Sequence, residues 1–116
     1  MKHNLMRLLL LLLFTSAYAQ DQVNVVKNEE GAKLVVNGED FMINGMNWDY
    51  IPIGTNTVNA KFWEKSDDVI KAGLDTEMSL LKNMGVNVIR QYTGDPAKWI
   101  QYIYDNYGIY AMLTRS

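Results

Sequence analysis

The sequence has 116 residues, of which 11 are basic and 13 acidic, with one histidine and no cysteine. The lack of cysteine excludes a disulfide framework and a thiol nucleophile, and because His3 falls in an expected signal peptide, the mature chain holds neither a Ser-His-Asp triad nor a usual zinc site. The nucleotide-binding signatures GxGxxG and GxxxxGK[ST] are also missing, so we expect no metal, no cofactor, and chemistry limited to carboxylate, tyrosine, lysine or arginine side chains or to simple binding.

Residues 1–19 have the features of a secretory signal peptide. Lys2 and Arg7 supply positive charge, a run of leucines forms the apolar core, and Ala17–Ala19 is an A-x-A cleavage site. We therefore expect cleavage after Ala19 and a secreted or periplasmic protein. The apolar run is shorter than the roughly 20 residues that span a bilayer, so we expect no stable membrane span after cleavage. The mature chain has nine basic and 13 acidic residues, a net charge of −4 that argues against a nucleic-acid partner.

The segment after the signal predicts short β-strands. The stretch QVNVVK alternates weakly and can form a strand within an N-terminal extension at 20–33. Leu34–Val36 and Phe41–Ile43 flank Asn37-Gly38, a pair typical of type I′ turns, so we predict a hairpin. A second pair, Asn44-Gly45, is followed by further apolar residues, and we interpret it as a kink or close backbone approach within one strand.

A long loop is predicted from Asp49 to Lys65. It contains proline, glycine and several asparagines and threonines, together with the aromatic residues Tyr50, Phe62 and Trp63. A loop of this length in a compact domain is often functional. The alternative is that its aromatic side chains cap the edge of a core.

A first amphipathic helix is predicted between Ser66 and Gly85. Ser66 can cap its N-terminus, and Asp67 and Asp68 suit the positive end of the helix dipole. Gly85 suits the position just past the C-terminus. Asp75 is interpreted as part of a solvated face. Apolar residues recur at spacings of three and four: Ile70, Leu74, Met78, Leu81 and Met84.

A second helix is predicted between two apolar runs, Val86–Ile89 and Ile109–Leu113. Asp95 is its expected N-cap, Pro96 its first residue and Gly108 its end. Its apolar stripe is formed by Trp99 or Ile100, then Ile103 and Tyr107. Apolar strands that alternate with amphipathic helices are typical of parallel βαβ units in which helices cover both faces of the sheet.

Candidate site residues follow from this architecture, because ligands of parallel α/β proteins bind at the carboxyl ends of the strands. Trp48 and Asp49 follow the first core strand, and Arg90 ends the second. The fork of donors on Arg90 suits a carboxylate, whereas the rings of Trp48, Tyr50 and Tyr92 suit stacking on sugars. The structural alternatives are a salt bridge for Arg90, core packing for Trp48 and a turn cap for Asp49.

The stretches LVVNGEDFMINGMNWDY and DTEMSLLKNMGVNVIRQYTGDPAKWIQYIYDNYGIYAML resemble the start of the catalytic domain of family 2 glycoside hydrolases, in clan A. The related glucanosyltransferases share much of this outline. The usual histidine shortly after the arginine is missing, and RQYTGDP stands in its place. The matching motifs are Asn37-Gly38, Gly45-Met46-Asn47, Leu81-Lys82 through Asn87 and Arg90, and Asp105 through Gly108.

The resemblance implies an α/β fold that is the N-terminal portion of a (β/α)8 TIM barrel, with about three strands and two helices, preceded by a short β-hairpin. Residues 34–116 are then an incomplete TIM-barrel glycoside hydrolase domain. The implied protein is the N-terminal fragment of an exported retaining glycosidase that cleaves O-glycosyl bonds of a β-linked oligo- or polysaccharide. Arg90 supports its nucleophile, while the acid/base and nucleophile glutamates are expected beyond Ser116. Its substrate-binding residues are Trp48, Asp49, Tyr50 and Tyr92.

Three alternatives stay open at this point. The protein can be a non-catalytic carbohydrate-binding or cell-surface protein that uses the aromatic loop, or a transglycosidase similar to the glucanosyltransferases. It can also be a complete small α/β protein with a three-stranded sheet. Glutamates at the ends of later strands would distinguish the enzymes from the others.

Overall fold

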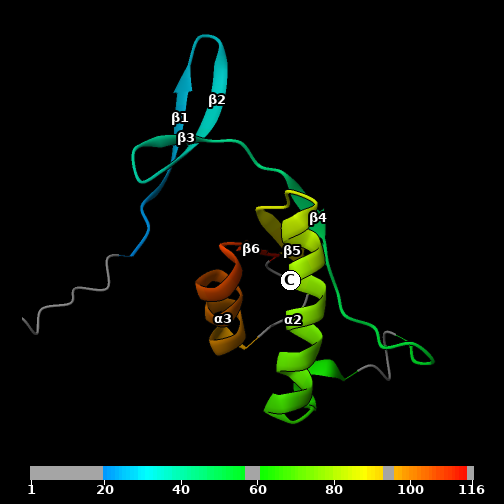
Figure 1. Ribbon diagram of the computed structural model, residues 1–116. Helices are drawn as coiled ribbons and strands as arrows, with labels where there is room; N and C mark the ends of the chain where they lie inside the picture. Colours follow the sequence, from blue (N-terminus) through cyan, green and yellow to red (C-terminus); the bar gives the residue numbers. More distant parts are fainter. Residues whose placement is uncertain (1–19, 57–60, 93–95, 115–116) are drawn as a thin grey trace, which may run out of the picture. The chain divides into compact units, whose positions relative to one another are not determined.

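The computed structural model describes residues 20–56, 61–92 and 96–114, and the chain divides into two compact units after Met42. The predicted signal peptide, residues 1–19, lies outside the described residues. Each unit has its own three-stranded sheet (Figure 1). The first unit contains β1 (Val23–Asn28), β2 (Gly31–Val36) and β3 (Glu39–Phe41). The second contains β4 (Gly45–Asn47), the 3-10 helix η1 (Phe62–Glu64), α2 (Asp67–Asn83), β5 (Val88–Gln91), α3 (Ala97–Tyr107) and β6 (Tyr110–Leu113).

The prediction that the chain forms the N-terminal portion of a TIM barrel behind a short hairpin is wrong. The first sheet is antiparallel with the order β1-β2-β3, and the second is a separate parallel sheet with the order β4-β5-β6 and two helices. Alternating strands and helices predict parallel pairing, which the structure has, but the same pattern fits any small α/β sheet. A barrel additionally requires closure by further strands with a fixed stagger, which the pattern does not encode.

The antiparallel sheet confirms the predicted turn and the predicted strand that precedes it. Asn37 and Gly38 have φ angles of 52° and 85°, the positive values that a type I′ turn requires at both central residues. The stretch QVNVVK forms most of β1, as predicted, and β1 pairs with β2 along its whole length, from Val23 opposite Val36 to Asn28 opposite Gly31. The boundary expected at residue 34 therefore falls inside β2.

The second Asn-Gly pair marks the start of a new sheet. Gly45 is the first residue of β4. The preceding residue, Asn44, makes two hydrogen bonds to the segment after α2: its N–H donates to Asn87 Oδ1 at 2.8 Å and its Nδ2 to the Gly85 carbonyl at 2.7 Å. A Cβ on Gly45 would lie 3.4 Å from the Val88 carbonyl oxygen. The predicted close backbone approach is therefore correct. Its placement inside one continuous strand is wrong, since β3 ends at Phe41.

Helix α2 follows the predicted pattern closely. It begins after Ser66, whose side chain makes no capping hydrogen bond, and Gly85 follows its end with a φ of 82°. Four of the five predicted stripe residues are buried, whereas Met84 is 63% exposed because it lies past the last turn. The buried residues are Ile70, Leu74, Met78 and Leu81.

Helix α3 begins at Ala97, with Pro96 as its N-cap rather than its first residue. The predicted cap, Asp95, lies outside the described residues. Trp99, and not Ile100, is the buried residue of the first turn. Gly108 ends the helix in the left-handed conformation, as predicted, with a φ of 65°.

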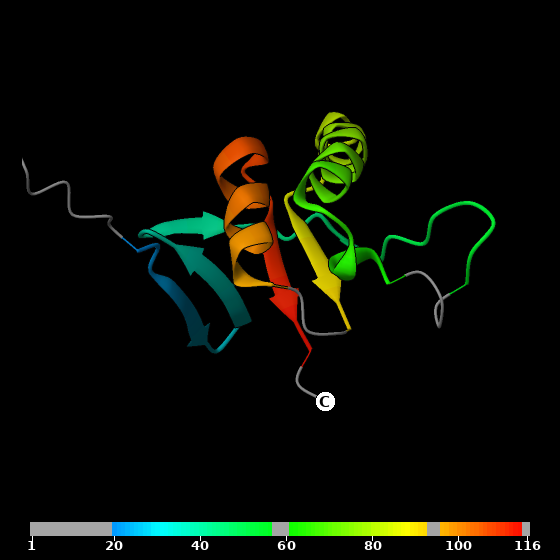
Figure 2. The ribbon, with the colours of Figure 1, turned by 90° about the horizontal axis from the view of Figure 1, so that it is seen from below.

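The two helices lie on the same face of the parallel sheet. Figure 2 shows α2 and α3 on the same side of β5 and β6, and Ile89 is fully buried in the cluster formed with those helices. Side chains alternate along a strand, so Val88 and Arg90 lie on the opposite face, where Val88 is only 6% exposed but Arg90 is exposed like Met112. The expectation of helices on both faces is therefore wrong, and Ile109–Leu113 is buried only at Ile109.

Candidate functional site

The carboxyl ends of β4, β5 and β6 form one edge, because the three strands are parallel and in register. Asn47 pairs with Arg90, and Arg90 pairs with Met112. The ladder continues past the strands, since the Trp48 N–H donates to the Arg90 carbonyl at 3.0 Å. The structure thus places Trp48 beside Gln91, just before the expected loop.

Arg90 is held by a tyrosine rather than by a carboxylate. Its guanidinium carbon lies 4.6 Å from the centre of the Tyr92 ring, and its Nη1 donates to the Tyr92 hydroxyl at 3.1 Å. Both side chains are exposed, and Tyr92 comes directly after the end of β5. No acidic residue in the described part of the chain pairs with Arg90, so the salt-bridge alternative is not supported there.

Four aromatic rings form a continuous cluster between the end of β4 and η1. Ring centres are 6.5 Å apart for Trp48 and Tyr50, and 6.4 Å apart for Trp48 and Trp63. Phe62 joins them, at 4.5 Å from Tyr50 and 4.9 Å from Trp63. The loop aromatics therefore cap the core edge, as the structural alternative stated, and they bring Phe62 and Trp63 to the predicted site.

The predicted site residues differ in accessibility. Trp48 is 7% exposed and belongs to the core, so its ring offers no open stacking surface. Tyr50 is half-buried, while Tyr92 is 50% exposed. Asp49 is exposed and makes no hydrogen bond within the described residues, so the turn-cap alternative fails for it. The structure places all five predicted residues at or next to one sheet edge. Among them, Arg90 and Tyr92 are the pair in which the two side chains contact each other and are both exposed.

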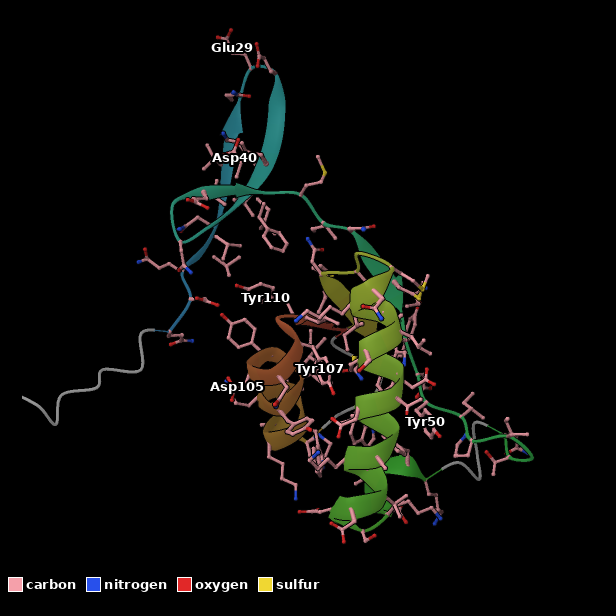
Figure 3. The ribbon with its side chains drawn as sticks, viewed as in Figure 1. Glu29, Asp40, Tyr50, Asp105, Tyr107 and Tyr110 are labelled. Carbon is pink, nitrogen blue, oxygen red and sulfur yellow. The ribbon has the colours of Figure 1, made fainter. Side chains whose placement is uncertain are left out.

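A glycine on α2 makes room for the cluster. An added Cβ at Gly73 would lie 3.0 Å from two ring atoms of Phe62 and 3.7 Å from Tyr50. Distances near 3 Å are tighter than ordinary van der Waals contact, so Phe62 can sit against the helix only because Gly73 has no side chain. Figure 3 shows Tyr50 beside this helix.

Gln91 was missed by the sequence reasoning. It is the last residue of β5 and is 4% exposed, the only buried polar side chain among the described residues. The signal was present, because residues two apart on a strand share a face and Ile89 is a core residue. Gln91 Oε1 and Trp48 Nε1 both lack a hydrogen-bond partner within the described chain.

A second polar cluster lies away from this edge, between the two helices. Asp75 on α2 accepts hydrogen bonds from Lys71 at 2.6 Å, Tyr102 at 2.5 Å and Tyr107 at 2.6 Å. Those bonds, that of Lys71 foremost, lower the pKa of Asp75 from 3.8 to about 2, and the same contact raises the pKa of Lys71. Burial and then the bond to Asp75 raise the pKa of Tyr107. Asp75 was predicted to be simply solvated, which is wrong.

Comparisons with known proteins supply no family. No protein-family model matches the chain, and no curated protein or solved structure matches it either. Within the ranges that the structure describes, no three His, Cys, Asp or Glu side chains are grouped so that they could hold a metal ion. In the same ranges, no helix is both long enough and apolar enough to cross a membrane. The resemblance to family 2 glycoside hydrolases therefore stays a prediction.

Proposed function

We propose that the protein acts on a β-linked glycan outside the cytoplasm, as the N-terminal part of an exported retaining glycoside hydrolase. The observation that carries the proposal is the Arg90–Tyr92 pair. It places a cation with no carboxylate partner among the described residues on the face of β5 opposite the two helices. The position lies near the carboxyl edge of a parallel sheet, where α/β proteins bind ligands.

Arg90 has the chemistry to stabilise a catalytic carboxylate. A guanidinium carries five N–H donors, and the contact with the Tyr92 hydroxyl uses only one nitrogen. The remaining donors can hold a glutamate in its ionised form through charge-assisted hydrogen bonds. In a retaining enzyme this glutamate is the nucleophile, about 5 Å from a second carboxyl group that serves as acid and base. Both glutamates would be supplied by sequence beyond Ser116.

The exposed side chains near the carboxyl edge of the sheet suit a sugar. The Tyr92 side chain is 50% exposed and offers an apolar surface, and the carboxylate of Asp49 can accept hydrogen bonds from sugar hydroxyls. Tyr50 presents the accessible part of the aromatic cluster. Tyr92, Asp49 and Tyr50 are the proposed substrate contacts, while the buried Trp48 packs against the ring of Tyr50.

Non-catalytic glycan binding is the second candidate. Of the described acidic residues, only Asp49 lies within two residues after the end of a strand of the parallel sheet. One carboxylate cannot supply both groups of a retaining mechanism. Glycan binding therefore needs only the residues already described, whereas hydrolysis or transfer to a second sugar also needs two catalytic glutamates.

The test is a glycosidase assay on the full product of the gene. We expect hydrolysis of aryl β-glycosides and β-linked oligosaccharides, and a fall in kcat/KM of about 100-fold or more in Arg90→Ala, because the cation stabilises charge at the nucleophile. Lys98→Ala is the control, since Lys98 is an exposed cation paired with Asp67 on the helical side. Formation of longer saccharides would indicate transfer instead of hydrolysis.

The remaining outcomes separate the candidates. Glycan binding without turnover, weakened in Arg90→Ala and unchanged in Lys98→Ala, would support the non-catalytic candidate. Absence of both turnover and binding across a panel of β-linked glucans, mannans and galactans would contradict the proposal.

A further inference from the structure

Two buried polar atoms without partners lie at neighbouring positions on the parallel sheet. Trp48 is 7% exposed and Gln91 is 4% exposed. The indole Nε1 of the first and the amide Oε1 of the second make no hydrogen bond within the described residues. Buried polar groups in folded proteins are almost always satisfied, so two exceptions need an explanation.

Strand pairing places these two side chains on the same face. Asn47 pairs with Arg90, and the Trp48 N–H donates to the Arg90 carbonyl, so Trp48 follows Asn47 just as Gln91 follows Arg90. In parallel strands, residues at matching positions project in the same direction, about 5 Å apart. Gln91 shares its face with Ile89, which is the face covered by α2 and α3.

The two atoms have complementary hydrogen-bonding capacity. An indole N–H only donates and an amide oxygen only accepts. A hydroxyl group can accept from the first and donate to the second in a single position, which neither an ion nor an apolar group can do. Leaving both atoms unsatisfied would cost about 1–3 kcal/mol each, so a hydroxyl at this position removes a substantial penalty.

We propose that Trp48 and Gln91 form a binding site for one hydroxyl group. The hydroxyl can belong to a buried water molecule, which typically makes about three hydrogen bonds to such groups, or to a sugar of the bound glycan. The sugar source rests on the proposed function, whereas the water source does not. Tyr50 and Trp63, which pack on the Trp48 ring, would have to move aside to admit a sugar.

The first experiment asks whether Gln91→Met raises or lowers the stability of the protein. Gln91→Met keeps an unbranched side chain of similar length and removes the acceptor. If a water occupies the site, we expect the ratio of folded to unfolded protein to fall about fivefold, because a satisfied hydrogen bond is lost. If the oxygen is unsatisfied in the free protein, the same change removes a buried penalty and raises that ratio. Urea unfolding followed by circular dichroism measures it.

A double-mutant cycle shows whether the two residues share one hydroxyl. Trp48→Phe keeps an aromatic ring but removes the N–H, and the cycle with Gln91→Met cancels the cost of the smaller ring. Trp99→Phe is the matched control, since Trp99 is a second buried indole whose Nε1 lacks a partner within the described chain, but on α3. We expect coupling between positions 48 and 91 that exceeds the coupling between 99 and 91.

The last experiment uses tetrasaccharides of β-linked glucose and mannose as probes. If a sugar hydroxyl occupies the site, we expect Gln91→Met to weaken tetrasaccharide binding about tenfold, even if the same change stabilises the free protein. If the wild type binds no glycan, but Gln91→Met lowers stability and positions 48 and 91 are coupled, the result supports a bound water at this site and contradicts the proposed function. The proposal is overturned if Gln91→Met stabilises the protein and leaves glycan affinity unchanged, or if the 48–91 coupling does not exceed the control.

Discussion

The hydroxyl of Tyr107 on α3 donates a 2.6 Å hydrogen bond to Asp75 Oδ1 on α2. The same oxygen accepts a second bond from Tyr102 at 2.5 Å, and Lys71 contacts the other carboxylate oxygen at 2.6 Å. One carboxylate therefore connects two helices that are far apart in the sequence. The two helices also share the buried cluster above β5, so the polar bridge and the apolar contact act on the same interface.

Replacing this carboxylate is expected to loosen the α2–α3 interface. Asp75→Asn keeps the size of the side chain but removes the charge that strengthens all three hydrogen bonds. We expect Tm to fall by roughly 4–8 °C. Asp105→Asn is the control, because Asp105 accepts its bond from Gln101 of its own helix. Equal Tm values for the two variants would contradict a bridging role for Asp75.

The same residue predicts a pH dependence of stability. Its pKa is lowered from 3.8 to about 2 in the folded protein, first by Lys71 and then by the two tyrosines. The folded state therefore binds fewer protons than the unfolded state, so this contribution is complete above about pH 4 and is lost as the pH falls towards 2. Urea unfolding at pH 5 and at pH 2.5 measures the loss, which should be smaller in Asp75→Asn than in the wild type. An identical dependence in both proteins would show that other carboxylates cause it.

Gly73 is expected to be required by the aromatic cluster. Gly73→Ala gains up to about 1 kcal/mol of helix propensity, but its Cβ would lie 3.0 Å from two atoms of the Phe62 ring. Overpacking of this kind costs about 1–3 kcal/mol, so we expect a net loss of about 1 kcal/mol in unfolding free energy together with altered tryptophan fluorescence. Ala72→Gly, at an exposed neighbouring position, measures the propensity term alone. A Gly73→Ala protein that is more stable than wild type, with unchanged fluorescence, would contradict the tight packing.

Local sequence signals predicted the elements well, because they depend on neighbouring residues. Asn37-Gly38 specifies a turn through the φ angles it tolerates, and Gly108 ends α3 for the same reason. The helical stripe of α2 follows from spacing alone. Residues such as Met112 were misjudged, since burial on a sheet depends on what covers each face, and both helices lie on the face opposite Met112.

The sequence predicted where the candidate residues lie in the fold but not what they contact. The sequence places Trp48, Arg90 and Tyr92 near strand ends, and the structure agrees. It could not indicate that Phe62 and Trp63 bury Trp48, nor that tyrosines 27 and 32 residues away bind Asp75. Those contacts depend on how a loop and a second helix fold back, which no local pattern records.

The role of Tyr92 can be separated into its ring and its hydroxyl. Tyr92→Phe keeps the surface that faces the Arg90 guanidinium and removes only the oxygen that accepts from Nη1, whereas Tyr92→Ala removes both. An exposed cation–π contact is worth about 0.5–1 kcal/mol. We therefore expect Tyr92→Ala to weaken glycan binding about fivefold or more, because Arg90 loses its fixed orientation and the sugar loses a stacking surface. Tyr92→Phe should have a smaller effect.

Measurements of stability show whether Tyr92 acts in glycan binding or in folding. Both side chains are exposed, and surface substitutions usually change unfolding free energy by no more than about 0.5 kcal/mol, so Tm should stay near that of the wild type in both variants. The NMR signal of the Arg90 Nε–H reports the orientation directly and should move most in Tyr92→Ala. If that signal and glycan affinity are both unchanged in Tyr92→Ala, Tyr92 neither orients Arg90 nor contacts the sugar.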